Sequence, residues 1–381
     1  MDQNTSRVIV KKCENYDYNE ISSIISDSFK ALNLEPELKN IKNVLLKPNL
    51  VMAKEPKFAV TTHPVIVDAL CENLKKINKN LKIIIGEASG SVLFEGTKKA
   101  FKVSGLEDVA KKYDAKIVYF ETSKRKKVAV NGGIIKEFNL PEEILDCDFI
   151  INLPKLKTHT FVRYTGAVKN LFGLLSTDQK MNCHKKLHRQ KDFVANLINL
   201  HNAVKPDLNI MDGVIGMDGN GPTTGHPKKI GYILISQDAL ALDYTASNLV
   251  GFKNKSNPLI NYAEKNKLIN KIELLGDDIK KIKFKKPFGL RTMIPELLGS
   301  KIQNFLIPNV TFDAEKCKKC FVCVKACPAA ALKLDKNIHE KPQIDYDICL
   351  RCYCCHELCP NKAISLKGPF KNITNKLLRR K

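Results

Sequence analysis

Nine of the thirteen cysteines lie between residues 317 and 359, in two runs that share the spacing C-x2-C-x2-C-x3-C-P. The runs are Cys317, Cys320, Cys323 and Cys327, then Cys349, Cys352, Cys355 and Cys359. In an intracellular chain, cysteines this closely spaced indicate metal ligation rather than disulfides. The C-x2-C-x2-C spacing lets three thiolates of one loop bind three irons of a cubane. The sequence therefore predicts two 4Fe–4S clusters.

The duplicated pattern spans about residues 310–367 and resembles the bacterial two-cluster ferredoxins. In that family the fourth cysteine of each run ligates the other cluster. The resemblance implies a first cluster held by Cys317, Cys320, Cys323 and Cys359. It implies a second cluster held by Cys349, Cys352, Cys355 and Cys327. Ligand exchange keeps such clusters within electron-tunnelling distance, so we expect this segment to transfer single electrons.

Paired zinc sites are the alternative use of eight cysteines, and they would require tetrahedral groups built from C-x2-C pairs. Two copies of the iron–sulfur spacing, each closed by a Cys-Pro pair, favour the clusters. Cys354 is a spare thiol beside the ligand Cys355. It is either a packing residue or an alternative ligand or redox-sensitive thiol.

Strand and helix patterns alternate over residues 1–286. An apolar strand at Val44–Leu46 precedes a helix over Pro64–Ile77, which has proline in its first turn, and Leu81–Ile85 is the next strand. Asn131-Gly132-Gly133 predicts the turn of a hairpin. Further strands are expected at 116–120, 148–153, 208–211 and 232–235, and further helices at 106–113, 167–175 and 193–204. Strands that alternate with helices predict an α/β fold with a largely parallel sheet.

Four segments are expected along the chain. Residues 1–286 form the α/β domain, and residues 310–367 form a small α+β domain of the bacterial ferredoxin type. A linker over 287–309 carries a short amphipathic helix, Met293–Ile307, which we expect to pack between the domains. Residues 368–381 form a basic tail. A membrane-surface role is the alternative for the linker and the tail, because basic and apolar residues alternate in both.

Segments 150–159, 164–173 and 211–225 of the α/β region are unusual for loops. Together with Lys47-Pro48-Asn49 and Gly86-Glu87, they resemble domain-of-unknown-function family 362. The resemblance covers about residues 8–276. Members of that family often carry a C-terminal two-cluster ferredoxin domain, so the resemblance implies the same two-part architecture here. It implies no defined reaction.

A ligand site is expected at one edge of the predicted sheet, because open α/β sheets bind ligands beyond the carboxyl ends of their strands. The candidate catalytic residues near this edge are Lys155, Lys157, His159, Lys169, Asp218 and Asn220. Their lysines would make the edge cationic and suited to a carboxylate or phosphate. Asp218 and Asn220 would be presented by a tight loop whose freedom comes from Gly213, Gly216, Gly219, Gly221 and Gly225.

Simpler explanations exist for several of these residues. A Lys-x-Lys pair is usually part of a solvated surface, and Asp218 and Asn220 commonly shape turns. Asp238 is expected to cap a helix that runs to about Val250. Asp243 lies in the apolar start of that helix and is a candidate buried partner for a site lysine.

His184 and His188 have i, i+4 spacing and would share one face of a helix. A metal site would need a third ligand, such as His159 or Asp218. The surrounding segment, 180–190, is very basic, which disfavours binding of a further cation. Anion binding, proton transfer and an ordinary surface therefore remain open for this pair.

The formal net charge of +23 bears on partners and on location. Most basic residues are lysine rather than the arginine that favours bidentate phosphate recognition, so a compositional origin of the charge and attraction of acidic partners or anionic substrates both remain open. No zinc finger, Walker loop or Gly-x-Gly-x-x-Gly after a strand is present, so we expect no specific nucleic acid. The chain shows no signal peptide and no long apolar run, which predicts a cytoplasmic protein with at most peripheral membrane contact. A redox partner protein and an anionic small molecule are the expected partners.

Three functions are compatible with these features. The first is an iron–sulfur oxidoreductase that moves electrons to or from an anionic substrate, or a redox centre, at the α/β domain. The second is an electron-transfer or docking protein without chemistry of its own. The third is a non-redox enzyme whose clusters are structural or regulatory.

Overall fold

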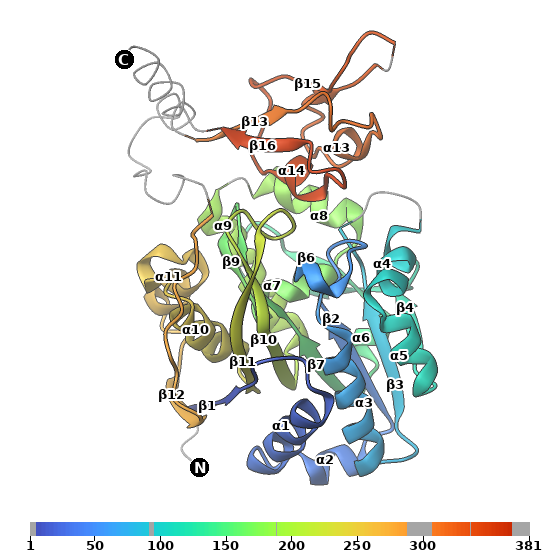
Figure 1. The fold of residues 1–381 in the computed structure, drawn as a ribbon, viewed down its shortest axis with the longest axis vertical. Helices are drawn as coiled ribbons and strands as arrows, with labels where there is room; N and C mark the ends of the chain where they lie inside the picture. Colours follow the sequence, from blue (N-terminus) through green and yellow to red (C-terminus); the bar gives the residue numbers. More distant parts are fainter. Residues whose placement is uncertain (1–4, 91–94, 188, 288–306, 336, 368–381) are drawn as a thin grey trace.

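The computed structural model describes residues 5–90, 95–187, 189–287, 307–335 and 337–367. Figure 1 shows a large α/β region with a small region, residues 307–367, seated at one end of it. The predicted linker helix lies outside the described residues except for Ile307, and so does the whole basic tail. Among the described residues, no helix is long and apolar enough to cross a membrane.

The large region is built on one mixed, mostly parallel sheet. Its strands in spatial order are β12 (Lys271–Gly276), β1 (Thr5–Lys12), β11 (His226–Ser236), β10 (Leu208–Asp218), β7 (Phe149–Leu153), β2 (Asn43–Pro48), β3 (Lys82–Glu87) and β4 (Lys116–Tyr119). Pairing is antiparallel only where β11 meets β1 and β10, and where β8 (Lys155–His159) meets β9 (Arg163–Thr165). The predicted α/β class with a largely parallel sheet is confirmed.

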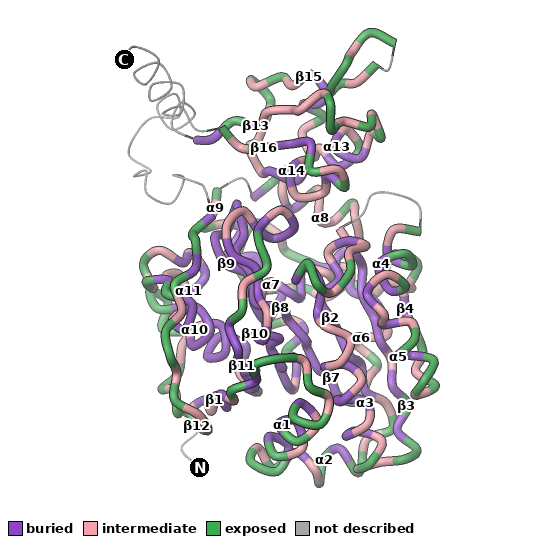
Figure 2. The backbone as a smooth tube through the Cα atoms, in the orientation of Figure 1, coloured by how far each residue is buried: buried purple, intermediate pink, exposed green. Residues whose placement is uncertain are grey.

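Helices cover both faces of this sheet (Figure 1). Side chains alternate along β2, so that Val44 and Leu46 pack into one core while Leu45 packs into the other. The first core is covered by α1 (Tyr18–Ala31), α2 (Glu35–Asn40), α3 (Pro64–Ile77), α4 (Gly96–Ser104) and α5 (Leu106–Lys112). The second core is covered by α7 (Ala167–Asn170), α8 (Thr177–Lys186), α9 (Gln190–Val204), α10 (Ala239–Leu249) and α11 (Pro258–Lys265). Figure 2 shows the buried interior strands between these helical layers.

Local sequence explains where several elements begin. Helix α3 starts at Pro64, whose missing N–H is not needed at that position, and His63 accepts a bond from the amide of Val65. Helix α10 follows Asp238, whose carboxylate accepts the amides of Leu240 and Ala241 at 2.8 and 3.1 Å. The predicted Pro64–Ile77 helix and the predicted Asp238 cap are both confirmed.

Three local predictions need correction. The prediction of a loop over residues 211–225 is wrong for residues 211–218, which belong to strand β10. Only the turn between Asp218 and His226 is irregular. Gly216 is required in this strand, since a Cβ there would lie 2.6 Å from the carbonyl oxygen of Leu156. Residues 155–159 form strand β8 beside β10 rather than a loop. The helix expected over 167–175 ends at Asn170 and continues as a 3-10 turn, Leu171–Leu174.

Shorter elements complete the two regions. The predicted hairpin forms from β5 (Arg125–Ala129) and β6 (Glu137–Pro141), and both glycines of its turn have positive φ. The large region also contains α6 (Glu142–Leu145) and the 3-10 turns Pro56–Phe58 and Asn254–Ser256. The small region contains β13 (Asn309–Phe312), α13 (Val322–Lys325), β14 (Leu332–Lys333), β15 (Gln343–Ile344), α14 (Cys354–Leu358) and β16 (Ile364–Lys367). In Figure 1, α14 faces the large region near α8.

Candidate functional site

The two cysteine runs surround two separate cavities in the small region. One cavity is lined by Cys317, Cys320, Cys323 and Cys359, together with apolar residues that include Phe321 and Ile364. The other is lined by Cys327, Cys349, Cys352 and Cys355, together with Tyr346 and Leu350. The fourth cysteine of each run therefore lies with the first three of the other run. Four thiols around each apolar hollow fit a 4Fe–4S cubane.

Backbone amides donate to the sulfur of the last cysteine in each run. The amide of Ala331 donates to Cys327 Sγ at 3.2 Å, and the amide of Ala363 donates to Cys359 Sγ at 3.3 Å. Both donors lie four residues after their cysteine, so the repeat extends to the hydrogen bonds as well as the ligands. Such bonds to sulfur stabilise the reduced cluster and raise its reduction potential.

A further cavity of about 130 Å³ lies between the small region and the carboxyl-terminal edge of the large sheet. Its volume accommodates a small molecule rather than a single water. The large region contributes lining residues from β8, α7, α8 and the ends of β2 and β3, and the small region contributes Ala326, Cys354, Glu357 and Leu358. Ala326 adjoins Cys327 and Cys354 adjoins Cys355, so the cavity wall borders the second cysteine set.

Three lysines give the cavity a cationic lining. Lys157 Nζ donates to Asn49 Oδ1 at 2.6 Å and to the carbonyl of Val60 at 2.8 Å. Lys180 Nζ donates to the carbonyl of Ala88 at 2.8 Å, and Lys169 Nζ lies 5.4 Å from the centre of the Phe172 ring. Burial lowers the pKa of all three, that of Lys157 well below its usual range and that of Lys180 to about 8.

A buried ion pair closes one side of the cavity. Lys47 Nζ contacts Glu87 Oε2, and both side chains are almost completely inaccessible to solvent. Burial pushes the pKa of Lys47 down and that of Glu87 up, while their mutual attraction opposes both shifts. Gly173 is needed here, because a Cβ would lie 2.7 Å from Lys47 Nζ. Glu87 is therefore paired with Lys47, and its attraction only partly opposes the lowering of the pKa of Lys180 and Lys157.

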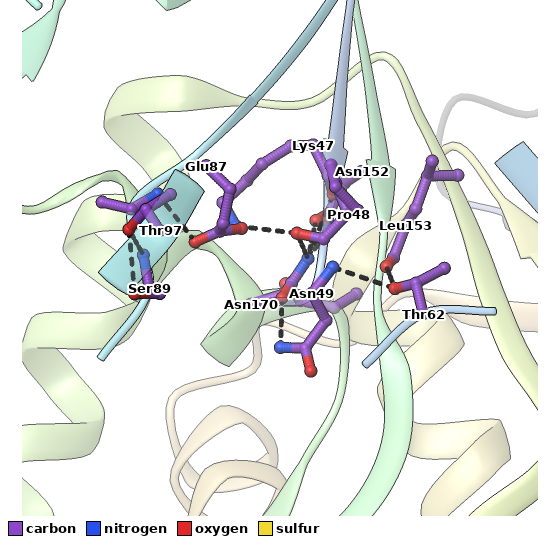
Figure 3. A network of polar contacts seen from close by, with 12 residues as sticks. Lys47, Pro48, Asn49, Thr62, Glu87, Ser89, Thr97, Asn152, Leu153 and Asn170 are labelled. Atoms are coloured by element: carbon purple, nitrogen blue, oxygen red, sulfur yellow. Dashed lines mark hydrogen bonds and ion pairs between the residues drawn. The ribbon is translucent and has the colours of Figure 1, made fainter. Parts of the chain in front are cut away.

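A row of asparagines runs from the cavity lining towards the sheet, and Figure 3 shows three of them, Asn49, Asn170 and Asn152. Asn49 Nδ2 donates to Asn170 Oδ1 at 2.7 Å, and Asn170 Nδ2 donates to Asn152 Oδ1 at 2.8 Å. Asn152 Nδ2 donates in turn to Asn209 Oδ1 at 2.8 Å. Because each amide orients the next, the row fixes the direction of Asn49 and thereby holds Lys157.

Two histidines in the cavity wall are neutral. Burial, followed by nearby Lys169, lowers the pKa of His159 well below its usual value and that of His184 to about 3. His159 Nδ1 accepts the amide of Phe161 at 3.1 Å, so its proton is on Nε2 and its 3.5 Å approach to Glu357 is no ion pair. His184 Nδ1 is buried and has no partner among the described residues. His188 lies outside the described residues, so the proposed histidine pair stays a prediction.

Glu357 and its neighbours attach the small region to the large one. Thr160 Oγ1 donates to Glu357 Oε1 at 2.9 Å, and Thr223 Oγ1 donates to the Glu357 carbonyl at 2.5 Å. His356 Nε2 lies 2.9 Å from Thr224 Oγ1. Burial raises the pKa of Glu357 to about 7, although Lys169 opposes that shift. These contacts hold the second cysteine loop over the cavity.

The structure brings three of the six predicted catalytic residues, Lys157, His159 and Lys169, into this cavity. Lys155 lies elsewhere, because its Nζ donates to Asp212 and Tyr16 at 2.7 Å each, in a buried ion pair with Asp212 beside the half-buried Tyr16. Asp218 accepts the amide of Lys285 at 3.0 Å, and the carbonyl of Asn220 accepts Thr224 Oγ1 at 2.6 Å. Asp218 thus attaches the segment after β12 to the end of β10, and Asn220 stabilises the β10–β11 turn; neither residue lines the cavity.

Asp243 does not pair with a lysine, which corrects the role expected for it. Its carboxylate accepts the amides of Ala167 and Val168 at 2.6 and 3.0 Å and the Tyr164 hydroxyl at 3.2 Å. It thus caps the short helix α7, which carries Lys169. Burial raises the pKa of Asp243 to about 7 in spite of these three donors.

Sequence reasoning did not single out Lys180 or Glu357. Ser176 precedes a helix with glutamine three residues later, a capping signal that would have placed Lys180 on a helix beside His184. Glu357 carries no comparable signal. Its position depends on how the two regions pack together, which neither region's sequence specifies alone.

Comparison with known proteins accounts for both regions. The profile of the Domain of unknown function (DUF362) family matches residues 44–248, more than half of the chain. The chain belongs to the DUF362 family. The profile of a 4Fe-4S dicluster domain matches residues 316–363, so this DUF362 protein carries a C-terminal 4Fe–4S ferredoxin-type domain and is an iron–sulfur protein.

Two individual proteins are similar to this DUF362 chain. A thylakoid-associated protein of Synechocystis sp. is 31% identical over 208 residues, which cover 54% of this chain and 62% of that protein. The chain thus matches less than two thirds of this relative's length. The lactate racemase apoprotein of Thermoanaerobacterium thermosaccharolyticum superposes with a TM-score of 0.44 at 12% identity, over 64% of this chain and 56% of that one.

Proposed function

We propose that this protein binds two 4Fe–4S clusters and transfers electrons to or from a small anionic substrate held in the cavity between its two regions. The proposal is supported by one cavity wall that combines the buried Lys157 and the half-buried Lys169 and Lys180 with the loop of the second cysteine run. The proposed ligands are Cys317, Cys320, Cys323 and Cys359 for the first cluster, and Cys349, Cys352, Cys355 and Cys327 for the second.

The charge of the cavity favours an anion. The described lining contains two acidic side chains, and one of them, Glu87, is already paired with Lys47. Only Glu357 is left to balance the three cavity lysines, Lys157, Lys169 and Lys180. Burial without enough negative charge lowers the pKa of these lysines, and an anion among them would restore their protonated form. Its carboxylate, phosphate or sulfate oxygens would accept the charge-assisted hydrogen bonds that lysine donates.

Neutral groups complete the site. When bound, the clusters supply or accept one electron each. The His159 ring, with its proton on Nε2, can donate a hydrogen bond to the substrate, and the free Nδ1 of His184 can accept one. Leu50, Val51 and Phe172 line the same cavity and exclude water from the bound anion.

Sulfate is a suitable first probe, because it neither titrates near neutral pH nor accepts electrons readily. We expect Lys180→Ala to weaken sulfate binding at least about tenfold, since a buried charge-assisted bond contributes roughly 1.5–3 kcal/mol. Lys185→Ala is the matched control, because Lys185 lies on the same helix but is exposed. Calorimetry on the anaerobic, cluster-loaded protein measures the sulfate affinity of each variant. Equal affinities for the two variants would contradict the assignment of the cavity.

The pH dependence of sulfate binding provides an independent test. Lys180 has a pKa of about 8 in the empty cavity, so it is largely protonated at pH 7 and largely neutral at pH 9. We therefore expect the affinity to fall as the pH rises through this range. The Lys180→Ala variant should show a flatter profile, and an unchanged profile would rule out Lys180 as the group responsible.

We also propose a cytoplasmic location. The similarity to a thylakoid-associated protein raises peripheral membrane contact as the competing placement. Fractionation of cells under low salt and high salt separates the two, because electrostatic contact with anionic lipid is lost at high salt.

A further inference from the structure

The two halves of the ferredoxin-type domain are related by a shift of 32 residues, which places Cys317 on Cys349 and Cys327 on Cys359. The residues between the cysteines differ in charge. Lys318 and Lys325 of the first loop correspond to Leu350 and Glu357 of the second, while Lys319 corresponds to Arg351. A difference at matched positions of a repeat indicates that the two loops face different surroundings.

The second loop is covered by the large region. Leu358 Cδ2 lies so close to Gly90 that a Cβ at that glycine would be 2.8 Å away. Glu357 accepts hydrogen bonds from Thr160 and Thr223 of the large region. A protein partner therefore has no direct access to this side of the second cysteine set.

The first loop is open to solvent. Cys320 is exposed, and Lys318, which lines the first cysteine cavity, is exposed beside it. Lys325 on α13 is exposed as well. Lys316 is paired with Asp313 at 2.8 Å, whereas Lys318 and Lys325 have no hydrogen-bond or ion-pair partner among the described residues. The exposed part of the first cysteine loop thus carries positive charge from Lys318 and Lys325.

We infer that this basic face, formed by Lys318, Lys319 and Lys325 around Cys320, is the docking surface for an acidic one-electron carrier protein. The inference rests on the proposed function, since it requires redox-active clusters. A reduced carrier would give one electron to a cluster held by Cys317, Cys320, Cys323 and Cys359, and the cluster beside the anion cavity would be the next acceptor. Opposite charges on the two proteins accelerate their encounter and orient the exposed Cys320 toward the carrier.

The test compares Lys318→Glu/Lys325→Glu with Lys30→Glu/Lys39→Glu, in anaerobic, cluster-loaded full-length protein. The control carries the same change of charge on exposed residues of α1 and α2, at the opposite end of the molecule in Figure 1. Stopped-flow absorbance follows cluster reduction by reduced flavodoxin, an acidic carrier, and by methyl viologen radical, a small cation. Iron content and circular dichroism establish that each variant keeps its clusters and fold.

We expect the loop variant to slow reduction by flavodoxin at low salt by about tenfold or more and to lose most of its salt dependence. The control should keep the native rate, and reduction by methyl viologen should not slow in either variant. Equal flavodoxin rates in the two variants would overturn the docking surface. Loss of binding to anionic phospholipid vesicles together with an unchanged flavodoxin rate would overturn it in favour of a membrane contact. Clusters that methyl viologen cannot reduce in the native protein would instead refute the proposed function.

Discussion

At the scale of single residues, the cavity depends on charges that are buried with few partners. Lys47 and Glu87 lie against Gly173, at a distance that leaves no room for a side chain there. Lysine and glutamate at these positions were visible in the sequence as residues that follow predicted strands. Their pairing was not, because β2 and β3 carry them to neighbouring points of one edge only after the sheet has formed.

Removing one member of this pair should destabilise the protein strongly. We expect Lys47→Met to lower the free energy of unfolding by about 3–5 kcal/mol, because Glu87 would be left buried and unpaired. Lys126→Met breaks the exposed pair of Lys126 with Asp146 and should cost at most about 1 kcal/mol. Urea unfolding followed by circular dichroism measures both, and similar losses for the two variants would contradict the buried pair.

At the scale of elements, short helices position two of the three cavity lysines, and strand β8 positions Lys157. The sequence pattern located most strands and the α3 and α10 helices, because their apolar periodicity and caps are local signals. It misplaced the extent of β10 and missed β8, since glycine and lysine disfavour buried strands. Those residues form strands here because Gly216 permits close packing and because Asp212 and Asn49 bind the lysines of β8.

Helix α7 should respond to the ionisation of its cap. Asp243 has a pKa of about 7 in the folded protein and a lower one when unfolded, so the folded state retains the proton over the intervening pH range. This contribution to stability is full below about pH 4 and is lost as the pH rises towards 7. Relative to Asp243→Asn, the native protein should therefore lose stability between pH 4 and pH 7.

Thermal unfolding of both proteins across this pH range measures the difference. The same variant should weaken sulfate binding, because the asparagine oxygen is a weaker acceptor for the amides of Ala167 and Val168, which begin the helix that carries Lys169. Parallel stability profiles for the two proteins would exclude Asp243 as the titrating group.

At the scale of the whole molecule, the cavity exists only where the two regions meet. The sequence identified each region from its own motifs, but it did not show that the second cysteine loop would cover the lysine edge. That arrangement results from contacts between residues more than 100 positions apart, such as Thr160 with Glu357. No periodicity or spacing encodes contacts of this kind.

Weakening these contacts should therefore affect the cavity without removing the clusters. We expect Thr160→Val/Thr223→Val to reduce sulfate affinity several-fold, because each lost hydrogen bond contributes about 1 kcal/mol to holding Glu357 and its loop. Thr311→Val is the control, because Thr311 bonds to Ser365 within the small region. Calorimetry measures the sulfate affinity, and iron analysis measures the cluster content. A larger loss of sulfate affinity in Thr311→Val than in the double variant would argue against a cavity shared by the two regions.

An anion bound beside a redox-active cluster should change the reduction potential of that cluster, and a redox titration measures this change. The loaded protein, with about eight irons for two cubanes, is titrated with and without sulfate and followed by EPR. A nearby anion disfavours an added electron, so one potential should become more negative, by about 59 mV if reduction weakens sulfate binding tenfold. At a sulfate concentration that just saturates the native protein, Lys180→Ala should reduce this shift and Lys185→Ala should retain it. Potentials that sulfate leaves unchanged at saturation, or a protein that binds zinc in place of iron–sulfur clusters, would contradict the account.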